Sequence, residues 1–154
     1  MRFPRSSGVL LHPTSFPGPY GIGDLGDAAI EWIEFLARHG QQLWQVFPLG
    51  PTGYGDSPYQ CFSAFAGNPL LISPDRLLAA GLLDADDLAD VPAFPAQSID
   101  FGGVIAWKMT LLATAFDHFR ARATAADRAA LDAWCAENAA WLDDDALFMA
   151  VQGA

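Results

Sequence analysis

The sequence is poor in positive charge. Only 8 of its 154 residues are Lys or Arg, against 18 Asp and Glu, and the formal net charge is −10. A nucleic-acid partner needs a basic surface that neutralises its phosphates, and an anionic membrane surface needs one as well. We therefore expect neither nucleic acid nor a membrane as a partner of this protein.

Cysteine and long apolar runs are equally scarce. Cys61 and Cys135 stand alone in unrelated contexts, which is typical of reduced thiols in the cytoplasm, although the sequence leaves a single disulfide open. The apolar run before His12 has four residues, too few for the core of a secretory signal, and no later stretch approaches the ~20 residues of a membrane span. These absences predict a cytoplasmic protein.

The usual signatures of metal and nucleotide binding are missing too. The three histidines are scattered, with no carboxylate or thiol at ligand spacing, so we predict no metal site; whether His12 lines another kind of site stays open. Residues 21–26, GIGDLG, match a dinucleotide-binding fingerprint. However, three prolines separate Leu11 from Gly21, and no acidic residue stands near residues 44–46 to bind a ribose. We therefore predict a turn into a helix there and no cofactor.

What the sequence does contain is a strand–helix–strand pattern in its first third. Gly8–His12 is a short continuous apolar run, typical of a strand buried on both faces, and Gln42–Leu49 is again strand-like. Between them Gly26–Gly40 has helical periodicity, with Asp27 as the predicted N-cap. The apolar stripe of this helix is predicted to be Ala29, Trp32, Ile33, Leu36 and Ala37. The order predicts a βαβ unit with parallel strands.

The rest of the chain has the pattern of packed helices. Ser73 is a predicted N-cap, residues 91–103 form a Pro-rich connector, Val104–Phe119 is a strong helix, and residues 124–153 supply one or two more. The apolar face of the strong helix is predicted to be Ile105, Met109, Leu112 and Phe116. Two parallel strands do not make a stable sheet without further strands and covering helices. We therefore expect the front part of a longer α/β protein.

The loop after the second strand, residues 48–69, is rich in Gly, Pro and aromatic residues and has a single charge. It leaves the carboxyl end of a parallel strand, where α/β proteins bind ligands. Tyr54 and Tyr59 each lie in a Gly/Pro frame and offer an apolar face with one hydroxyl, which suits a neutral sugar. Tertiary packing of an irregular loop is the competing interpretation.

The acidic residues near this face do not suggest catalysis. Asp24 suits a turn, Asp27 is the predicted cap and Asp56 suits an Asx-turn, and none has an evident carboxylate partner for glycosidic chemistry. Phe62 and Phe65 are spaced like core contacts, so we expect both to be buried.

Longer stretches carry a family resemblance. GVLLHPTSFPGPYGIGDLG (residues 8–26), followed by LWQVFPLGPTGYGDSPYQCFSAFAGNPLLI (43–72), is similar to the amino-terminal region of amylomaltase, the 4-α-glucanotransferase or disproportionating enzyme. The likeness covers the whole chain, including DFGGVIAWK (100–108) and WLDDDALFMA (141–150). The resemblance implies a glycosyltransferase of starch, glycogen and maltooligosaccharide metabolism. Such an enzyme breaks an α-1,4 bond, holds a covalent glucosyl-enzyme and passes the glucan to another sugar, with retention and without a cofactor.

The resemblance also implies an architecture and a set of binding residues. The fold would be a (β/α)8 TIM barrel, with residues 1–70 as its first βαβ unit and residues 71–154 as an inserted, mainly helical subdomain. The catalytic carboxylates would lie beyond residue 154, so the isolated chain would be inactive. It would still carry part of the substrate path, contributed by Ser57, Tyr59, Tyr54 and Phe101.

These four residues have separate roles in that picture. Ser57 and Tyr59 match family positions on the donor side of the cleft, near the scissile bond. Tyr54 matches an aromatic residue of a second glucan-binding groove, whose other aromatic position is Phe101 here and a tyrosine in some members. Phenylalanine keeps the stacking face but lacks the hydroxyl, which leaves the working of that second site open.

Two other classes of protein remain as alternatives from the sequence. One is a non-catalytic carbohydrate-binding module that uses the same uncharged aromatic loop. The other is a purely structural helical domain in which the loop only packs.

Overall fold

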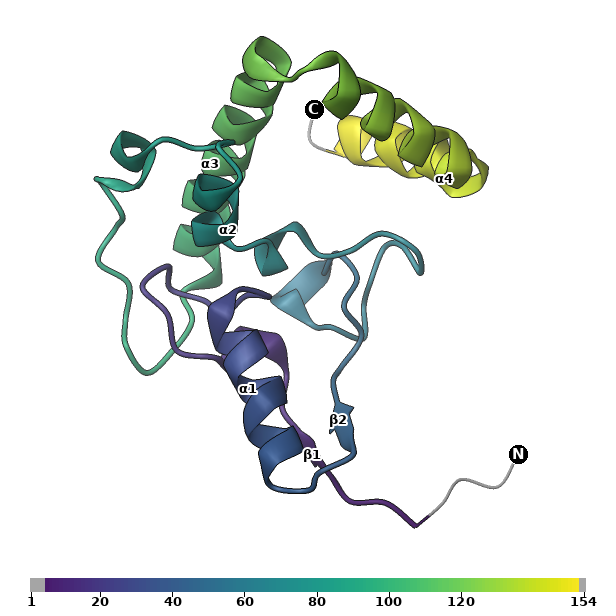
Figure 1. Cartoon of the computed structure of the whole chain (residues 1–154). Helices are drawn as coiled ribbons and strands as arrows, with labels where there is room; N and C mark the ends of the chain where they lie inside the picture. The colour runs from purple at the N-terminus through teal and green to yellow at the C-terminus, as the bar shows by residue number, and fades with distance from the viewer. Residues whose placement is uncertain (1–4, 153–154) are drawn as a thin grey trace.

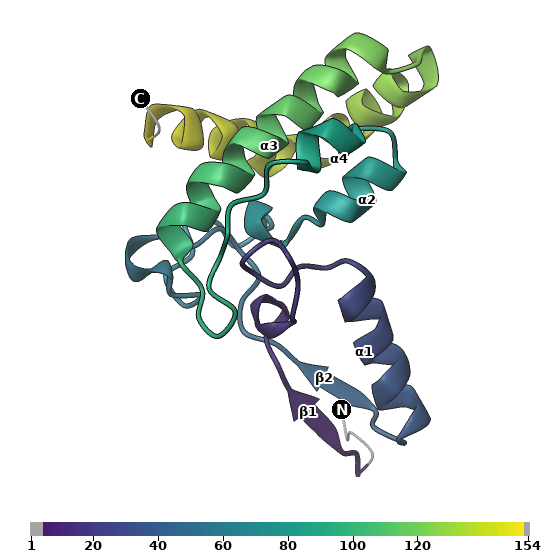
Figure 2. The ribbon, with the colours of Figure 1, turned by 90° about the vertical axis from the view of Figure 1, so that its left-hand side faces the viewer.

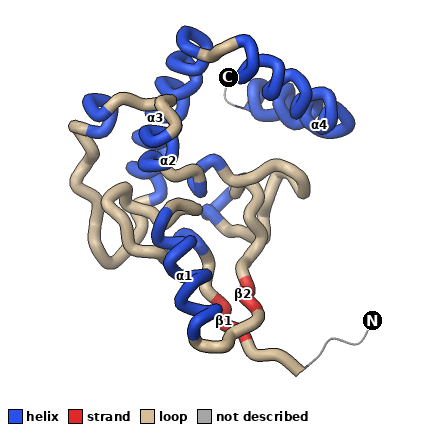
Figure 3. The backbone as a smooth tube through the Cα atoms, viewed as in Figure 1, coloured by secondary structure: helices blue, strands red, loops and turns tan. Residues whose placement is uncertain are grey.

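The structure is a computed structural model that describes residues 5–152, except the side chains of Tyr54 and Gln152. Its helices and strands are β1 (Gly8–Leu10), α1 (Asp27–Arg38), β2 (Leu43–Gln45), α2 (Pro74–Ala79), α3 (Phe101–Arg122) and α4 (Ala125–Gln152). The strands and α1 lie at one end of the molecule and the other three helices at the opposite end (Figures 1 and 2). Long irregular segments join the two ends (Figure 3).

The predicted strand–helix–strand unit is confirmed. β1 and β2 pair in parallel, with Gly8 opposite Leu43 and Leu10 opposite Gln45. Both strands are shorter than predicted, and the expectation that the first is buried on both faces is wrong: Leu10 is exposed, as is Leu43. Among the described residues α1 is the helix that lies beside these strands, so much of the sheet surface has no cover (Figure 1).

Helix α1 begins one residue earlier than its predicted cap requires. Gly26 is the N-cap and Asp27 is the first helical residue, so the prediction that Asp27 caps the helix is wrong. Asp24 lies in the preceding turn and accepts a hydrogen bond from the Gly26 amide at 2.8 Å. Asp27 instead forms an ion pair with Arg76 of α2, and its charge in the first turn also favours the helix dipole. The C-terminal stop is as predicted, because Gly40 has φ of +69°.

The predicted apolar stripe of α1 is buried only in part. Ala29 and Leu36 are buried, whereas Ile33 is exposed. The reason is the same as for the strands, since the narrow two-stranded sheet covers only a strip of the helix.

Helix α3 is longer than predicted and buries a different face. Asp100 is its N-cap and accepts a hydrogen bond from the Gly103 amide at 3.2 Å, so the Pro-rich connector ends at Asp100 and Phe101 is already helical. Three of the four residues of the predicted face, Ile105, Met109 and Phe116, are exposed. The buried face is made of Val104, Lys108, Leu111 and Ala115. It is offset by one residue from the predicted face, which is about 100° around the helix.

Two clusters of the core lie against this face of α3, while α1 contributes the buried Ala29 and Leu36. Ile22, Leu70 and Val104 form one buried cluster, and Leu83 packs with the next two turns of α3 in a second. Partly buried side chains that pack on the two clusters are Phe94, Ile99, Phe101, Leu77, Leu82, Leu88 and Trp107. We call this region the α3 seam.

Helix α4 is one continuous helix where the sequence allowed one or two. Thr124 precedes it, and its hydroxyl accepts a hydrogen bond from the Asp127 amide at 3.2 Å while Asp127 accepts in return, which is the reciprocal pattern of an N-terminal cap. No helix within residues 5–152 is long and apolar enough to cross a membrane.

Phe62 and Phe65 contact α4 and are not buried. The ring of Phe62 lies 5.7 Å from Phe148, and that of Phe65 stacks on Trp141 at 6.1 Å, yet both phenylalanines remain exposed. The expectation that they belong to the core is therefore wrong. The aromatic spacing indicated ring contacts correctly, but these contacts lie on the surface.

Candidate functional site

The segments that follow β1 and β2 leave the sheet at the same end, because the strands are parallel. The first passes through a short 3-10 turn, Pro13–Ser15. The indole of Trp44 in β2 donates a hydrogen bond to the carbonyl of Leu11 at 2.7 Å. The two strand ends are therefore tied together where their loops begin.

The segment after β2 contains a closed loop, residues 49–68, which we call the aromatic loop. Its neck is closed by a hydrogen bond from the Asn68 amide to the Leu49 carbonyl at 2.7 Å. Inside the neck, Thr52 and Cys61 form an antiparallel bridge, with further backbone hydrogen bonds on both sides of it. These bonds satisfy backbone groups that an open loop would leave to water, so the loop holds a defined shape.

The tip of the aromatic loop is the 3-10 turn Tyr54–Asp56. Gly55 and Asp56 have φ of 70° and 53°, in the left-handed region that glycine and aspartate tolerate better than most residues. Tyr59, which follows this turn, contacts the ring of Phe47, two residues beyond β2. The side chain of Tyr54 lies outside the described residues, so its predicted contact with glucan stays a prediction.

Tyr59 and Ser57 are adjacent on the aromatic loop, and both can be reached from solvent. Tyr59 is 72% exposed. Its ring lies 5.7 Å from that of Phe47 at an interplanar angle of 50°. Ser57 is half-buried, and its hydroxyl accepts a hydrogen bond from the Tyr59 amide at 3.4 Å. The pair offers an aromatic face and a hydroxyl, and the single charged residue of the aromatic loop, Asp56, directly precedes Ser57.

His12 extends this aromatic group toward the sheet. Its ring lies 5.5 Å from Phe47, which contacts Tyr59 in turn, so three rings follow one another from the end of β1 to the aromatic loop. Burial lowers the pKa of His12. Its Nδ1 atom is buried without a hydrogen-bond partner among the described residues. Sequence reasoning left His12 open and did not identify Phe47; in the structure His12 follows β1 and Phe47 follows β2.

Phe101 belongs to a different group of contacts from these three rings. It is the first residue of α3, it is half-buried, and it packs on the cluster of Ile22, Leu70 and Val104. Part of its surface stays accessible, so the predicted stacking role remains a prediction alongside its packing role.

A groove of about 540 Å³ runs beside this cluster, between the segment after β1 and the connector before α3. It is lined by residues 14–19, 21–23 and 94–99, none of which is charged. Backbone groups, hydroxyls and aromatic faces dominate its walls, a surface suited to neutral polar ligands.

The acidic residues of this region serve the fold. Burial raises the pKa of Asp24, while the charge of Lys108 and hydrogen bonds from the Gly26 amide and the Ser73 hydroxyl oppose that rise. Lys108 itself is fully buried, and burial lowers its pKa to about 8. Sequence reasoning did not identify Lys108. The available signal was a lone lysine at helical spacing among apolar residues.

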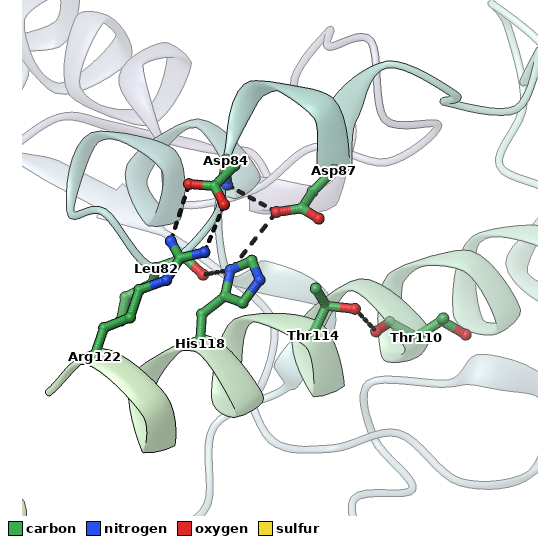
Figure 4. Close-up of polar contacts among 7 residues, drawn as sticks. All are labelled: Leu82, Asp84, Asp87, Thr110, Thr114, His118 and Arg122. Carbon is green, nitrogen blue, oxygen red and sulfur yellow. Dashed lines mark hydrogen bonds and ion pairs between the residues drawn. The ribbon is translucent and has the colours of Figure 1, made fainter.

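A second polar cluster joins the segment after α2 to the end of α3 (Figure 4). Arg122 donates to both carboxylate oxygens of Asp84, at 2.9 and 2.6 Å, and the Asp84 amide donates to Asp87 at 2.7 Å. His118 Nδ1 lies 3.2 Å from the Leu82 carbonyl and 3.7 Å from Asp87.

Ligand atoms of Asp84, Asp87 and His118 come within 4.8 Å of one another, a proximity that sequence spacing did not predict. The arrangement is nevertheless that of an ion-pair clasp. Arg122 occupies both oxygens of one carboxylate, and a carbonyl beside His118 Nδ1 requires that nitrogen to carry its proton. A metal ion would have to displace these contacts.

Comparison with known proteins shows which family the chain resembles. A family model described as 4-alpha-glucanotransferase matches residues 11–154. The chain is 51% identical over 154 residues to the 4-alpha-glucanotransferase of Thermus thermophilus, covering 100% of this chain and 30% of that protein. It is 48% identical over 150 residues to the enzyme of the same name from Synechocystis sp., covering 97% of this chain and 30% of that protein.

A solved structure agrees with these sequence relatives. The amylomaltase of Streptococcus agalactiae in complex with acarbose superposes with a TM-score of 0.89 and 36% identity, over 97% of this chain and 30% of that one. The chain thus spans about 30% of the length of the relatives it matches.

Proposed function

This chain belongs to the 4-alpha-glucanotransferase family, and we propose that its protein transfers α-1,4-glucan segments between sugars. The observation that carries the proposal is the 51% identity over all 154 residues to a 4-alpha-glucanotransferase. The substrates would be maltooligosaccharides derived from starch or glycogen. The protein would act in the cytoplasm without a cofactor.

In this proposal the fold is the first part of a (β/α)8 TIM barrel. Residues 1–70 form the first βαβ unit with its loops on the active-site face, and residues 71–154 form an inserted, mainly helical subdomain. The parallel pairing of β1 and β2 supports the barrel, because the strands of such a barrel are all parallel.

The chemistry would be a retaining double displacement. One carboxylate attacks the anomeric carbon as the glycosidic bond breaks, and a carboxylic acid gives its proton to the leaving oxygen. The same group then removes a proton from the hydroxyl of an acceptor sugar, which attacks the glucosyl-enzyme and releases the first carboxylate. We assign these carboxylates to sequence beyond residue 154.

The contribution of this chain would be substrate binding. Tyr59 would place its exposed ring against a sugar at the donor subsite, and the Ser57 hydroxyl would exchange a hydrogen bond with it. Tyr54 and Phe101 would stack a second, more distant stretch of glucan. The exposure of Tyr59 supports this role, since a glucan is neutral and its sugar rings have apolar faces.

The 154-residue chain provides the test. We expect no disproportionation of maltotriose by chromatography, together with saturable binding of maltoheptaose by calorimetry. Tyr59→Ala should weaken binding ~10-fold, equivalent to ~1.4 kcal/mol, because the stacking face is lost, and Tyr59→Phe should retain most of it. Phe116→Ala removes an exposed ring from α3 and serves as the matched control.

Three results would decide against parts of this proposal. Longer and shorter products from maltotriose would show that the catalytic carboxylates are misplaced. Unchanged affinity in a folded Tyr59→Ala variant would remove Tyr59 from the site. Binding without any transfer by the longest natural form of the protein would favour the carbohydrate-binding module.

A further inference from the structure

Lys108 is the only lysine in the sequence, and it is fully buried. It lies on the core face of α3 with Val104 one turn before it and Leu111 one turn after it. Its Nζ donates a hydrogen bond to the carbonyl oxygen of Leu70 at 2.7 Å. An ammonium group removed from water is costly unless other groups replace its solvation, so this contact needs an explanation.

The charged group that acts on Lys108 is Asp24, from the segment after β1. Asp24 is itself held by the Gly26 amide and the Ser73 hydroxyl, and Asp75 of α2 acts on it as a like charge. The phenol of Tyr20 donates to Asp75 at 2.5 Å. Lys108 therefore lies where the segment after β1, the end of the aromatic loop and α3 meet.

The Leu70 carbonyl connects Lys108 to the aromatic loop through a continuous set of hydrogen bonds. Leu70 lies in the 3-10 turn Pro69–Leu71, and its amide donates to the side chain of Asn68 at 2.9 Å. The Asn68 amide in turn donates to the Leu49 carbonyl at 2.7 Å and closes the neck of the loop. Lys108 thus holds a residue two positions beyond the neck.

Leu70 is also held from a second direction, through the cluster on which Phe101 packs. Phe101 and Lys108 are seven positions apart, two helical turns, so they lie on one face of α3. Phe101 packs on the cluster that contains the Leu70 side chain, while Lys108 binds the Leu70 carbonyl. The mutual position of the aromatic loop and the start of α3 is therefore set at Leu70.

We propose that Lys108 is a positioning residue for glucan binding, which locks the neck of the aromatic loop against α3 so that Ser57 and Tyr59 are presented correctly. This inference rests on the proposed function. Packing alone gives no reason for a lysine, because an apolar side chain of similar size would fill the space without a desolvation cost. A hydrogen-bonded ammonium fixes a direction that an apolar contact leaves open.

The first test compares Lys108→Met with Arg120→Met, which removes one positive charge from an exposed position of the same helix. We expect Lys108→Met to weaken maltoheptaose binding about 10-fold and to accelerate amide exchange in residues 49–68 while exchange in α1 stays unchanged. Arg120→Met should change neither quantity. A folded Lys108→Met variant with normal loop exchange and normal affinity would overturn the proposal.

The second test uses the wild-type chain and needs no substitution. Labelling with [13Cε]-lysine gives one protein resonance, because there is one lysine. We expect saturating maltoheptaose to shift this resonance and its titration midpoint, since binding tightens the loop held by Lys108. A resonance that does not respond while calorimetry shows binding would contradict the inference. This test holds even if the Lys108→Met variant fails to fold.

Failure of the proposed function gives a different pattern. If the wild-type chain binds no maltoheptaose, glucan binding by this chain is rejected. The exchange experiment then decides on Lys108 separately: faster exchange confined to residues 49–68 in Lys108→Met supports a lock on the loop, and unchanged exchange rejects it.

Discussion

The strand unit and the α3 seam bury their side chains to very different degrees. Leu43 in β2 is 57% exposed, whereas Val104 and Lys108 in the seam are fully buried and Leu83 is 1% exposed. Both regions are rich in apolar residues, so composition does not explain the difference. Two short parallel strands offer too little surface to cover a helix, while several segments converge on α3 and close around it.

The difference shows where this chain carries its stability and where it carries its candidate site. The seam supplies a rigid base, and the aromatic loop projects from it with Tyr59 exposed. Binding residues are often placed on loops that a rigid scaffold holds. The apolar surface of the strand unit suits a region that further barrel strands and helices would cover in the proposed fold.

The largest expected effect comes from a cavity in the seam. Leu83→Ala should lower the free energy of unfolding by ~3 kcal/mol, which corresponds to ~10 °C in melting temperature. Leu43→Ala in the strand unit should lower it by less than ~1 kcal/mol, because that side chain is already in water. Circular dichroism melting measures both. Equal losses would break the comparison between the two regions.

A smaller effect is expected from the titration of Lys108. Its pKa is about 8 in the fold against 10.5 as its ordinary value. Between these values the unfolded chain binds a proton that the folded chain does not, so stability rises with pH. The free energy of unfolding should increase by ~2 kcal/mol between pH 8 and 10, and urea unfolding at a series of pH values measures it.

The Lys108→Met variant is the control for this pH dependence. It should lose the rise, because the titrating group is gone. Above pH 10 the wild type should turn downward, since burial and the hydrogen bond to Asp75 raise the pKa of Tyr20 and its proton is held more tightly in the fold. A wild-type stability that is flat from pH 8 to 10 would contradict the burial of a charged Lys108.

The smallest effect is expected at the exposed clasp of Figure 4. Asp84→Asn removes the bidentate ion pair with Arg122. In the wild type the hydrogen bonds from Arg122 hold the pKa of Asp84 below its ordinary value. The melting temperature of the variant should lie slightly below that of the wild type at low salt and match it in 1 M NaCl, because exposed ion pairs are weak and are screened by salt. A large drop in melting temperature that persists in high salt would show that the clasp contributes to stability as the buried core does.

Local signals in the sequence predicted local structure well. Gly40 ends α1 with a positive φ, as expected of glycine after a helix. Ser73 stands at the N-cap of α2 before a proline at the first helical position. The parallel strand pair also followed from its spacing. The helix ends depend on residues close in sequence, and the strand pair follows from the regular order of strand, helix and strand.

The errors arose where distant residues decide. The apolar pattern of α3 favoured Ile105, Met109 and Phe116 as its core face, but the segments that converge on the helix bury Lys108 instead. A lysine is assigned to solvent by its charge, and only a carbonyl 38 positions away reverses that. Phe62 and Phe65 were expected in the core because the place of α4 beside them was not visible in the sequence.

The sequence by itself determined the family, the order of strands and helices, and the uncharged, aromatic character of the loop after β2, because these are written in residue types and short spacings. The tertiary structure alone decided which face of α3 is buried, that Tyr59 stays exposed beside Phe47, and that Lys108 meets the Leu70 carbonyl. Those outcomes depend on how segments far apart in the chain exclude water from one another, which no local pattern records.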